Sequence, residues 1–441
     1  MDRHKSWFTV KRGGKRRIRP IFSVLLILCY VVVSAWFLVN GFGERREPDD
    51  DSAGPAASPF PGSAPDHFRS FDAYGGANRA DVGDDSVVAR VFPPAVSVKG
   101  LYVSAWHISA GDRVNHYIEI CETTEVNSLV IDVKDDHGYI TFLTNTEGIA
   151  EASRFVVPDM EGLVSNLKSR GIYTIARIVC FKDPLWSNLH PELAIRDRWG
   201  GSWQDRGGVR WLDPYKTGTW DYIASVCMEA VRVGFDEIQL DYVRFPADGR
   251  LGDIDYGTAG EEKSKTEIIS EFMAYIREIL AVEGIRLSAD VFGIIAISNV
   301  DSQNIGQDLS LLLSNADSIC PMIYPSHFAN KRQNGTGQRI NGVLFEAPDL
   351  EPYEVVYNIL LATGRHLDPD MDHAIIRPYL QDFTASYLGE GYYIPYTAQQ
   401  VREQIQAVYD AGFVEWIIWN HISEYSADAF EAVSSQGNGT E

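Results

Sequence analysis

The sequence contains few cysteines and none of the common motifs for zinc or nucleotide binding. Its five cysteines are widely separated and include no C-x-x-C pair, so we expect buried thiols rather than a disulfide framework. Neither H-x-x-x-H nor H-E-x-x-H occurs, which argues against a zinc hydrolase. No glycine-rich phosphate fingerprint follows an apolar run, which argues against a nucleotide-binding sheet. We therefore expect neither a cofactor nor a bound metal.

Positive charge is also scarce outside the amino-terminal region. The chain has 39 Lys and Arg against 61 Asp and Glu, which gives a net charge of −22. Eight of the basic residues lie within residues 1–20, so the rest of the chain is more acidic than the whole. An acidic body repels nucleic acid, and we therefore expect no nucleic-acid partner.

One long uncharged run, Ile21–Val39, follows these basic residues. It approaches the length of about 20 residues that crosses a bilayer as a helix. We predict a cytoplasmic segment over 1–20, a transmembrane signal-anchor over 21–39 and an extracytoplasmic body, because basic residues stay inside. The protein would then be a single-pass protein of the cell membrane. The alternative is a cleaved signal peptide, since Val33-Ser34-Ala35 resembles a cleavage site, but the apolar run continues past it.

The rest of the chain divides into a linker, a folded body and a tail. Residues 40–96 are rich in Pro, Ser, Gly and Asp and are predicted to form a flexible, disordered linker. Residues 97–432 alternate short apolar runs with amphipathic patterns, which predicts an α/β fold, a (β/α)8 TIM barrel. An open doubly wound sheet is the alternative. Residues 433–441 are predicted to be a disordered tail.

The predicted barrel has eight strands and at least seven helices. The strands are expected at 99–106, 128–134, 173–181, 237–244, 286–292, 318–324, 374–381 and 415–420. The helices are expected at 113–123, 160–169, 219–233, 262–282, 305–313, 352–363 and 398–411.

The run Gly234–Pro246 predicts a strand that carries an aspartate near its carboxyl end. Alternation places Gln239, Asp241 and Val243 on one face of this strand. A carboxylate on a buried face is costly unless that face opens onto a polar cavity, and barrel active sites lie at the carboxyl ends of the strands. Asp290 is predicted to point inward from the next strand.

Two carboxylates on neighbouring strands suit glycoside hydrolysis. A separation of about 5–5.5 Å allows a nucleophile with an acid/base, and roughly 6.5–9.5 Å leaves room for an attacking water. Different surroundings can keep one carboxylate ionised and the other protonated. The structural alternative is an ion pair of Asp241 with Arg177 or Arg244.

A second acidic cluster follows the second predicted strand. Asp132 and Lys134 are predicted to share its inward face, where they could neutralise each other. Asp135, Asp136 and His137 precede a predicted hairpin at Gly138–Phe142, and Asp136 and His137 could be ordinary solvated turn residues. We interpret Asp132 and Asp135 as ligands of sugar hydroxyls, and a metal site built on Asp132, Asp135 and His137 is the alternative.

Aromatic side chains are expected at the same end of the barrel. Trp106, Tyr324 and Trp419 lie at predicted strand ends, and the segments 181–213 and 325–351 are long enough to overhang that end. Aromatic faces stack on the C–H faces of sugar rings, so this end is typical of a saccharide groove. The predicted substrate-binding residues are Trp106, Asp132, Lys134, Asp135, Arg177, Asp183, Arg244, Tyr324, His327, Arg377, Gln381, Trp419 and Asn420.

Six segments together resemble a bacterial family of glycoside hydrolase-like domains, and the resemblance covers about residues 97–430. The resemblance implies a TIM barrel related to the α-amylase and α-galactosidase groups, tethered outside the membrane in many members. In those groups the aspartate of the fourth strand is the nucleophile, which corresponds to Asp241. The acid/base of the amylase group is a glutamate on the fifth strand, where this chain has Asp290. The segments are Lys99–Ser104, Val130–Asp135, Ala176–Pro184, Trp211–Pro214, Gln239–Pro246 and Trp419–Asn420.

These observations predict a membrane-tethered glycosidase that acts on an extracellular or cell-wall polysaccharide. Asp241 is the predicted nucleophile and Asp290 the acid/base, with Arg177 and Arg244 holding Asp241 ionised. Two alternatives are a non-catalytic saccharide-binding barrel and a metal-dependent hydrolase.

Overall fold

The computed structural model describes residues 96–368 and 373–433. The predicted cytoplasmic segment and signal-anchor lie outside these residues, as do nearly all of the predicted linker and of the predicted carboxyl-terminal tail. In the described part, no helix combines the length and the apolar character needed to cross a bilayer.

The strands form a closed parallel barrel, which confirms the predicted fold class. The order around the ring is β1-β2-β3-β5-β7-β8-β12-β13, and β13 pairs with β1 to close it. Every pairing around this ring is parallel. The alternative prediction, an open doubly wound sheet, is therefore wrong. The bounds are β1 Lys99–Val103, β2 Ser128–Lys134, β3 Tyr173–Val179, β5 Glu237–Asp241, β7 Arg286–Phe292, β8 Ser318–Met322, β11 Ile375–Ile376, β12 Tyr379–Gln381 and β13 Trp416–Trp419.

Several strands end earlier than the apolar pattern predicts. Strand β1 stops at Val103, and the expected end of that strand is the short helix α2, Ala105–Ile108. The seventh strand is interrupted between β11 and β12 by Arg377-Pro378. Proline has no N–H to donate to the ladder, so the pairing breaks at that point.

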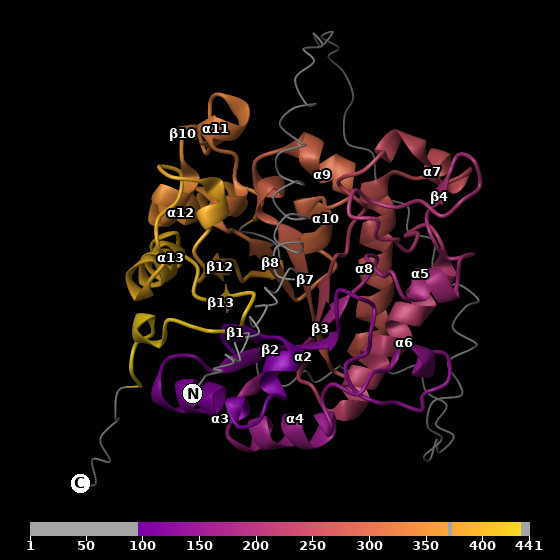
Figure 1. Cartoon of the computed structure of the whole chain (residues 1–441), viewed down its shortest axis with the longest axis horizontal. Coiled ribbons are helices and arrows are strands. Elements are labelled where there is room, and N and C mark those ends of the chain that lie inside the picture. The colour runs from indigo at the N-terminus through magenta and orange to yellow at the C-terminus, as the bar shows by residue number, and fades with distance from the viewer. Residues whose placement is uncertain (1–95, 369–372, 434–441) are drawn as a thin grey trace, which may run out of the picture.

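Helices surround the strands on the outside of the ring (Figure 1). The predicted helix 305–313 begins only at Leu309, as α10, because Gly306 adopts φ +79° where a preceding helix, α9, ends and Asp308 caps α10. The other helices begin and end within three residues of the predicted positions. The bounds are α3 Arg113–Thr123, α4 Met160–Ser169, α6 Thr217–Val233, α8 Lys265–Val282, α9 Asn299–Ile305, α10 Leu309–Leu313, α12 Pro352–Gly364 and α13 Ala398–Asp410.

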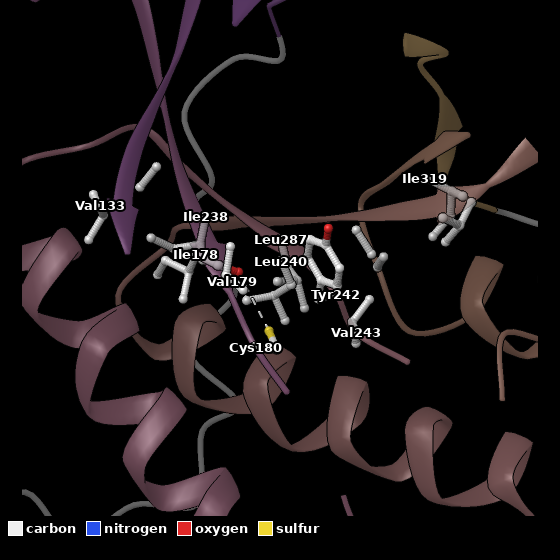
Figure 2. Close-up of a cluster of buried hydrophobic side chains, with 14 of the residues drawn as sticks. Val133, Ile178, Val179, Cys180, Ile238, Leu240, Tyr242, Val243, Leu287 and Ile319 are labelled. Carbon is white, nitrogen blue, oxygen red and sulfur yellow. Dashed lines mark hydrogen bonds between the residues drawn. The ribbon is translucent and has the colours of Figure 1, made fainter. Parts of the chain in front are cut away.

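The main hydrophobic core lies between the barrel and its helices. Side chains on the outer faces of β3, β5 and β7, such as Ile178, Leu240 and Leu287, are fully buried there (Figure 2). They pack beside α6 and α8. A smaller apolar cluster fills the barrel interior and contains Tyr102, Val130, Ile175, Cys320, Tyr324, Tyr379 and Ile417.

Three long segments follow strands β3, β5 and β8 at the carboxyl end of the barrel. The first two are joined by the antiparallel pairing of β4 (Arg196–Asp197) with β6 (Ile254–Asp255). They also carry the short helices α5 (Trp186–Leu189) and α7 (Ala259–Glu262). The third contains α11 (Lys331–Asn334) and the hairpin β9–β10, Gln338–Ile340 with Val343–Phe345.

Candidate active site

Asp241 is the last residue of β5, and its carboxylate forms an ion pair inside the barrel. Arg177, on the neighbouring strand β3, donates from Nε at 2.9 Å and from Nη2 at 2.5 Å to Asp241 Oδ2. The other oxygen, Oδ1, accepts the backbone N–H of Tyr242 at 2.5 Å. A carboxylate held at both oxygens has a fixed orientation, as a reacting group requires.

Arg177 also binds two further carboxylates. Its Nη1 donates to Asp132 Oδ1 at 2.7 Å, and its Nη2 lies 3.2 Å from Asp136 Oδ1. The hydroxyl of Tyr102, from β1, donates to Asp132 Oδ2 at 2.8 Å. Burial raises the pKa of Asp132 to about 6, although Arg177 opposes this. Burial acts in the same direction on Asp136, but Arg177 and Lys182 outweigh it and lower the pKa of Asp136.

Asp290 lies beside Asp241 on the adjacent strand β7. The register pairs Leu240 with Ala289, so Asp241 and Asp290 follow as the next neighbours across the two strands. Asp290 is 2% exposed, and its Oδ1 is buried without a hydrogen-bond partner. Burial raises the pKa of Asp290 well above its ordinary value, and repulsion from Asp241 raises it further. The two carboxylates therefore occupy different electrostatic surroundings.

The backbone directly after Asp241 is strained. Tyr242 has φ +49°, a conformation that bulky side chains rarely adopt. This turn ends the strand, so Val243 is buried in the outer core and not on the inward face that alternation predicts. The hydroxyl of Tyr242 accepts a hydrogen bond from Lys182 Nζ at 3.3 Å, and burial raises the pKa of that hydroxyl. Strain of this kind gathers at functional sites.

Aromatic rings line the opposite side of the barrel interior. Tyr324 and Trp419 lie 5.5 Å apart between ring centroids, and Trp419 lies 6.3 Å from Tyr102. Phe383 packs edge-on against both Tyr324 and Trp419. His327 contacts the Tyr324 ring at 4.9 Å, and burial lowers the pKa of His327 to about 3. The structure thus brings Tyr324, His327 and Trp419 together, as predicted.

Trp106 lies on helix α2, after the end of β1, and is 51% exposed. Its ring contacts the guanidinium of Arg154 at 5.2 Å, and the same guanidinium lies 4.9 Å from the ring of Tyr139. Trp106 therefore forms an exposed platform with Tyr139 rather than part of the inner wall.

Lys134 does not share the inward face with Asp132. A register irregularity between Asp132 and Lys134 pairs Lys134 with the outward residue Ile178. Lys134 Nζ instead forms a fully buried ion pair with Asp183 at 2.8 Å and donates to the Val179 carbonyl at 2.5 Å. Neither residue is available for substrate, so the structure places Lys134 and Asp183 in the scaffold.

Arg377 lies at the other end of the barrel. It donates to Glu237 at 2.6 Å, to Glu415 at 2.7 Å and to the Ser318 hydroxyl at 3.1 Å. Glu237 and Ser318 are the first residues of their strands, so this network closes the amino-terminal end. The register against β8 is the same before and after the break, so Arg377 keeps its inward position, and its side chain reaches the first residues of β5 and β8 instead of the predicted mouth.

Three other predicted ligands are held by hydrogen bonds within loops. Gln381 accepts from Ser326 and donates to Asp349 and to the Phe383 carbonyl. Asn420 accepts the N–H of Ile422, and Asp135 Oδ1 accepts the N–H groups of His137 and Tyr139. The turn that begins at Asp135 leads to the predicted antiparallel return, in which Ile140 pairs with Lys134. These side chains shape the loops around the mouth.

Arg244 occupies an aromatic cage instead of an ion pair with Asp241. Its guanidinium lies 4.5 Å from the ring of Phe292, 5.0 Å from Trp211 and 5.1 Å from Tyr242. Its Nη1 donates to the Phe245 carbonyl at 2.9 Å. Among the described residues, Arg177 is thus the cation paired with Asp241.

Tyr102, Asp136 and Tyr242 belong to this site but were not among the predicted ligands. Tyr102 follows the inward period of β1, and that period could have identified it. The position of Tyr242 depends on a positive φ that no sequence pattern indicates. Within residues 96–368 and 373–433, no three His, Cys, Asp or Glu side chains are grouped as a metal site.

The sequence of residues 100–425 matches the family described as a putative glycosyl hydrolase domain, DUF4015. The chain belongs to this family. The match spans the whole ring from β1 to β13, including Asp241 and Asp290. No curated protein is significantly similar to the chain in sequence.

Two solved structures are similar to the barrel. The glycoside hydrolase domain of PgaB (BpsB) from Bordetella bronchiseptica is 14% identical, with a TM-score of 0.53 over 76% of this chain and 99% of that chain. This likeness shows the fold. A hypothetical protein from Ruminiclostridium thermocellum ATCC 27405 is 42% identical over 44% of this chain and 99% of that chain, with a TM-score of 0.41.

Proposed function

We propose that the barrel hydrolyses glycosidic bonds of a polysaccharide with Asp241 as nucleophile and Asp290 as acid/base. One observation carries this proposal: the two carboxylates are neighbours across β5 and β7, but only Asp241 is paired with a cation. Membership of the glycosyl hydrolase-like family supports the reaction class.

The chemistry follows from these surroundings. The pKa of Asp290 is raised by burial and by Asp241, so Asp290 carries a proton that it can give to the leaving glycosidic oxygen. Asp241 attacks the anomeric carbon and forms a glycosyl ester, and Asp290 then takes a proton from the water that hydrolyses this ester. Neighbouring parallel strands lie about 4.8 Å apart, which favours the retaining mechanism over one with an intervening water.

The remaining groups bind and orient the sugar. Trp419 is partly exposed and offers a ring face for stacking, and the buried Tyr324 ring packs against it. Arg177 orients Asp241 and is itself held by Asp132. The substrate would be an extracellular or cell-wall polysaccharide, because we place residues 21–39 in the membrane and the barrel outside it.

The test is hydrolysis of a polysaccharide panel by the full-length protein and its Asp241→Asn and Asp290→Asn variants. We expect Asp241→Asn to lower turnover by at least about 10³-fold while substrate binding persists. Asp290→Asn should lower kcat by about 10²- to 10⁴-fold. Nuclear magnetic resonance of the first-formed anomer should show retention. Full activity of Asp241→Asn would refute the assignment.

A non-catalytic saccharide-binding barrel is the second candidate. Asp290 is only 2% exposed. A general acid must reach the glycosidic oxygen of the substrate, so the burial of Asp290 favours a barrel that binds saccharides without cleaving them. Under this function the wild-type protein binds a polysaccharide without releasing reducing ends, and Asp241→Asn leaves its affinity within about twofold.

A further inference from the structure

A pocket lies in the loops that follow β3 and β5, outside the carboxylate site. Its volume is about 590 Å³. The segments that form it are held together by the β4–β6 pairing. The pocket is lined by Asp197, Trp199, Ser202, Trp203, Gln204, Asp205, Arg206, Gly249, Arg250 and Asp253.

The acidic side chains of this pocket are already engaged. Asp197 Oδ1 accepts the N–H groups of Trp199 and Gly201, both at 2.9 Å. Asp205 accepts the N–H of Val209 and, at 3.1 Å, the indole N–H of Trp211. Asp253 forms an ion pair with Arg198 at 3.2 Å. These carboxylates therefore hold the loops together.

The two arginine side chains of the pocket, unlike its carboxylates, are not held by hydrogen bonds within the loops that the structure describes. The side chains of Arg206 and Arg250 are exposed, and neither makes a hydrogen bond or an ion pair with another side chain in the described part of the chain. Unpaired arginines are notable here because the whole chain carries a net charge of −22. Guanidinium groups bind carboxylates through two parallel hydrogen bonds.

Trp199 adds a stacking surface beside these arginines. It lines the pocket and is 72% exposed. The guanidinium of Arg198 lies 5.7 Å from the centroid of this ring, and the ring surface that stays exposed suits the C–H face of a sugar ring. An aromatic ring that lines the same pocket as two exposed guanidinium groups matches a sugar that carries a carboxylate.

Contacts between side chains link the pocket to the carboxylate site. Asp205, in the pocket wall, binds the indole of Trp211, and that indole packs edge-on against Tyr242 at 5.9 Å. Tyr242 directly follows Asp241. Two buried side chains, Trp211 and Tyr242, therefore link the pocket wall to Asp241.

We propose that this pocket is a distal subsite for a uronic acid unit of the polysaccharide, with Trp199 stacking on its ring and Arg206 and Arg250 binding its carboxylate. This inference rests on the proposed function, since it defines the substrate as an acidic glycan.

The test is equilibrium binding of hexasaccharides to the full-length protein by calorimetry, with the Asp241→Asn variant used to prevent turnover. The probes are hexagalacturonate, which is acidic, maltohexaose, which is neutral, and chitosan hexamer, which is cationic. Binding of hexagalacturonate should be the tightest and should weaken with added salt. Substituting Arg206→Gln with Arg250→Gln should weaken it by at least about tenfold.

The matched control removes two exposed positive charges from the segment after β8, as Lys331→Gln with Arg339→Gln. It should change the affinity for hexagalacturonate by less than about twofold. Trp199→Ala should weaken binding by about three- to tenfold. Because these side chains are exposed, unfolding is not expected, and circular dichroism checks it.

Equal affinity for maltohexaose, no affinity for hexagalacturonate, or an arginine double variant that binds like the control would overturn the subsite. Failure of the proposed function would give a different set of results. In that case no polysaccharide is hydrolysed by the wild type, while arginine-dependent binding of hexagalacturonate remains.

Discussion

Asp241 and Asp290 are neighbours on adjacent strands, but their hydrogen bonding differs sharply. Asp241 accepts two hydrogen bonds from Arg177 and one from a backbone N–H, whereas Asp290 Oδ1 is buried without any partner. Burial and repulsion from Asp241 raise the pKa of Asp290 well above its ordinary value. This shift makes the contribution of Asp290 to stability depend on pH.

The first prediction concerns the stability of Asp290→Asn. The pKa of Asp290 is raised in the folded state, so its contribution is fully present below the unfolded value of about 3.9 and is lost as pH rises through the folded pKa. Asparagine does not titrate and removes this loss. The midpoint of thermal unfolding should therefore rise in Asp290→Asn relative to wild type, by an amount that grows as pH increases above about 4. A difference that is constant between pH 4 and pH 8 would contradict it.

The second prediction compares two buried arginines at opposite ends of the barrel. Arg177 binds Asp132 and Asp241 at the mouth, and Arg377 binds Glu237 and Glu415 at the base. Removing one partner of a buried ion pair costs about 3–5 kcal/mol, so both Arg177→Met and Arg377→Met should lower the free energy of unfolding, measured with urea.

The two variants should differ in kcat. Per folded molecule, Arg177→Met should lose at least about 10²-fold in kcat because Asp241 is no longer oriented. Arg377→Met should retain kcat within about threefold, since its partners lie away from the mouth. Equal loss of kcat in both variants would place Arg177 in the scaffold alone.

The sequence predicts the barrel well because each strand has a strong apolar pattern, but it predicts the ends of strands poorly. The inward positions of Asp241 and Asp290 follow from alternation along regular strands. Alternation fails where the ladder is irregular, at the shift before Lys134. This shift depends on tertiary pairing and takes Lys134 out of the predicted site. Arg377 instead keeps its inward face, but its partners lie at the amino-terminal ends of the strands.

The third prediction concerns the aromatic wall. Trp419→Ala removes the ring that contacts both Tyr324 and Tyr102. If Trp419 stacks on the sugar in both ground and transition states, KM should rise by up to about tenfold with kcat nearly unchanged. Steady-state kinetics on the polysaccharide identified by the panel would measure this. A fall in kcat without a change in KM would instead place the ring against the reacting sugar only in the transition state.

The fourth prediction concerns Lys134 and Asp183, which the structure assigns to the scaffold. Their fully buried ion pair makes each one costly to remove alone, so Lys134→Met should lower the free energy of unfolding by about 3–5 kcal/mol. Adding Asp183→Asn neutralises the carboxylate left behind, and its amide oxygen can still accept the N–H of Trp186. The double variant should therefore be more stable than Lys134→Met, with a coupling of at least about 1 kcal/mol in a double-mutant cycle. Additive losses would mean that the two charges do not stabilise each other, and loss of substrate affinity in the folded double variant would return both residues to the binding site.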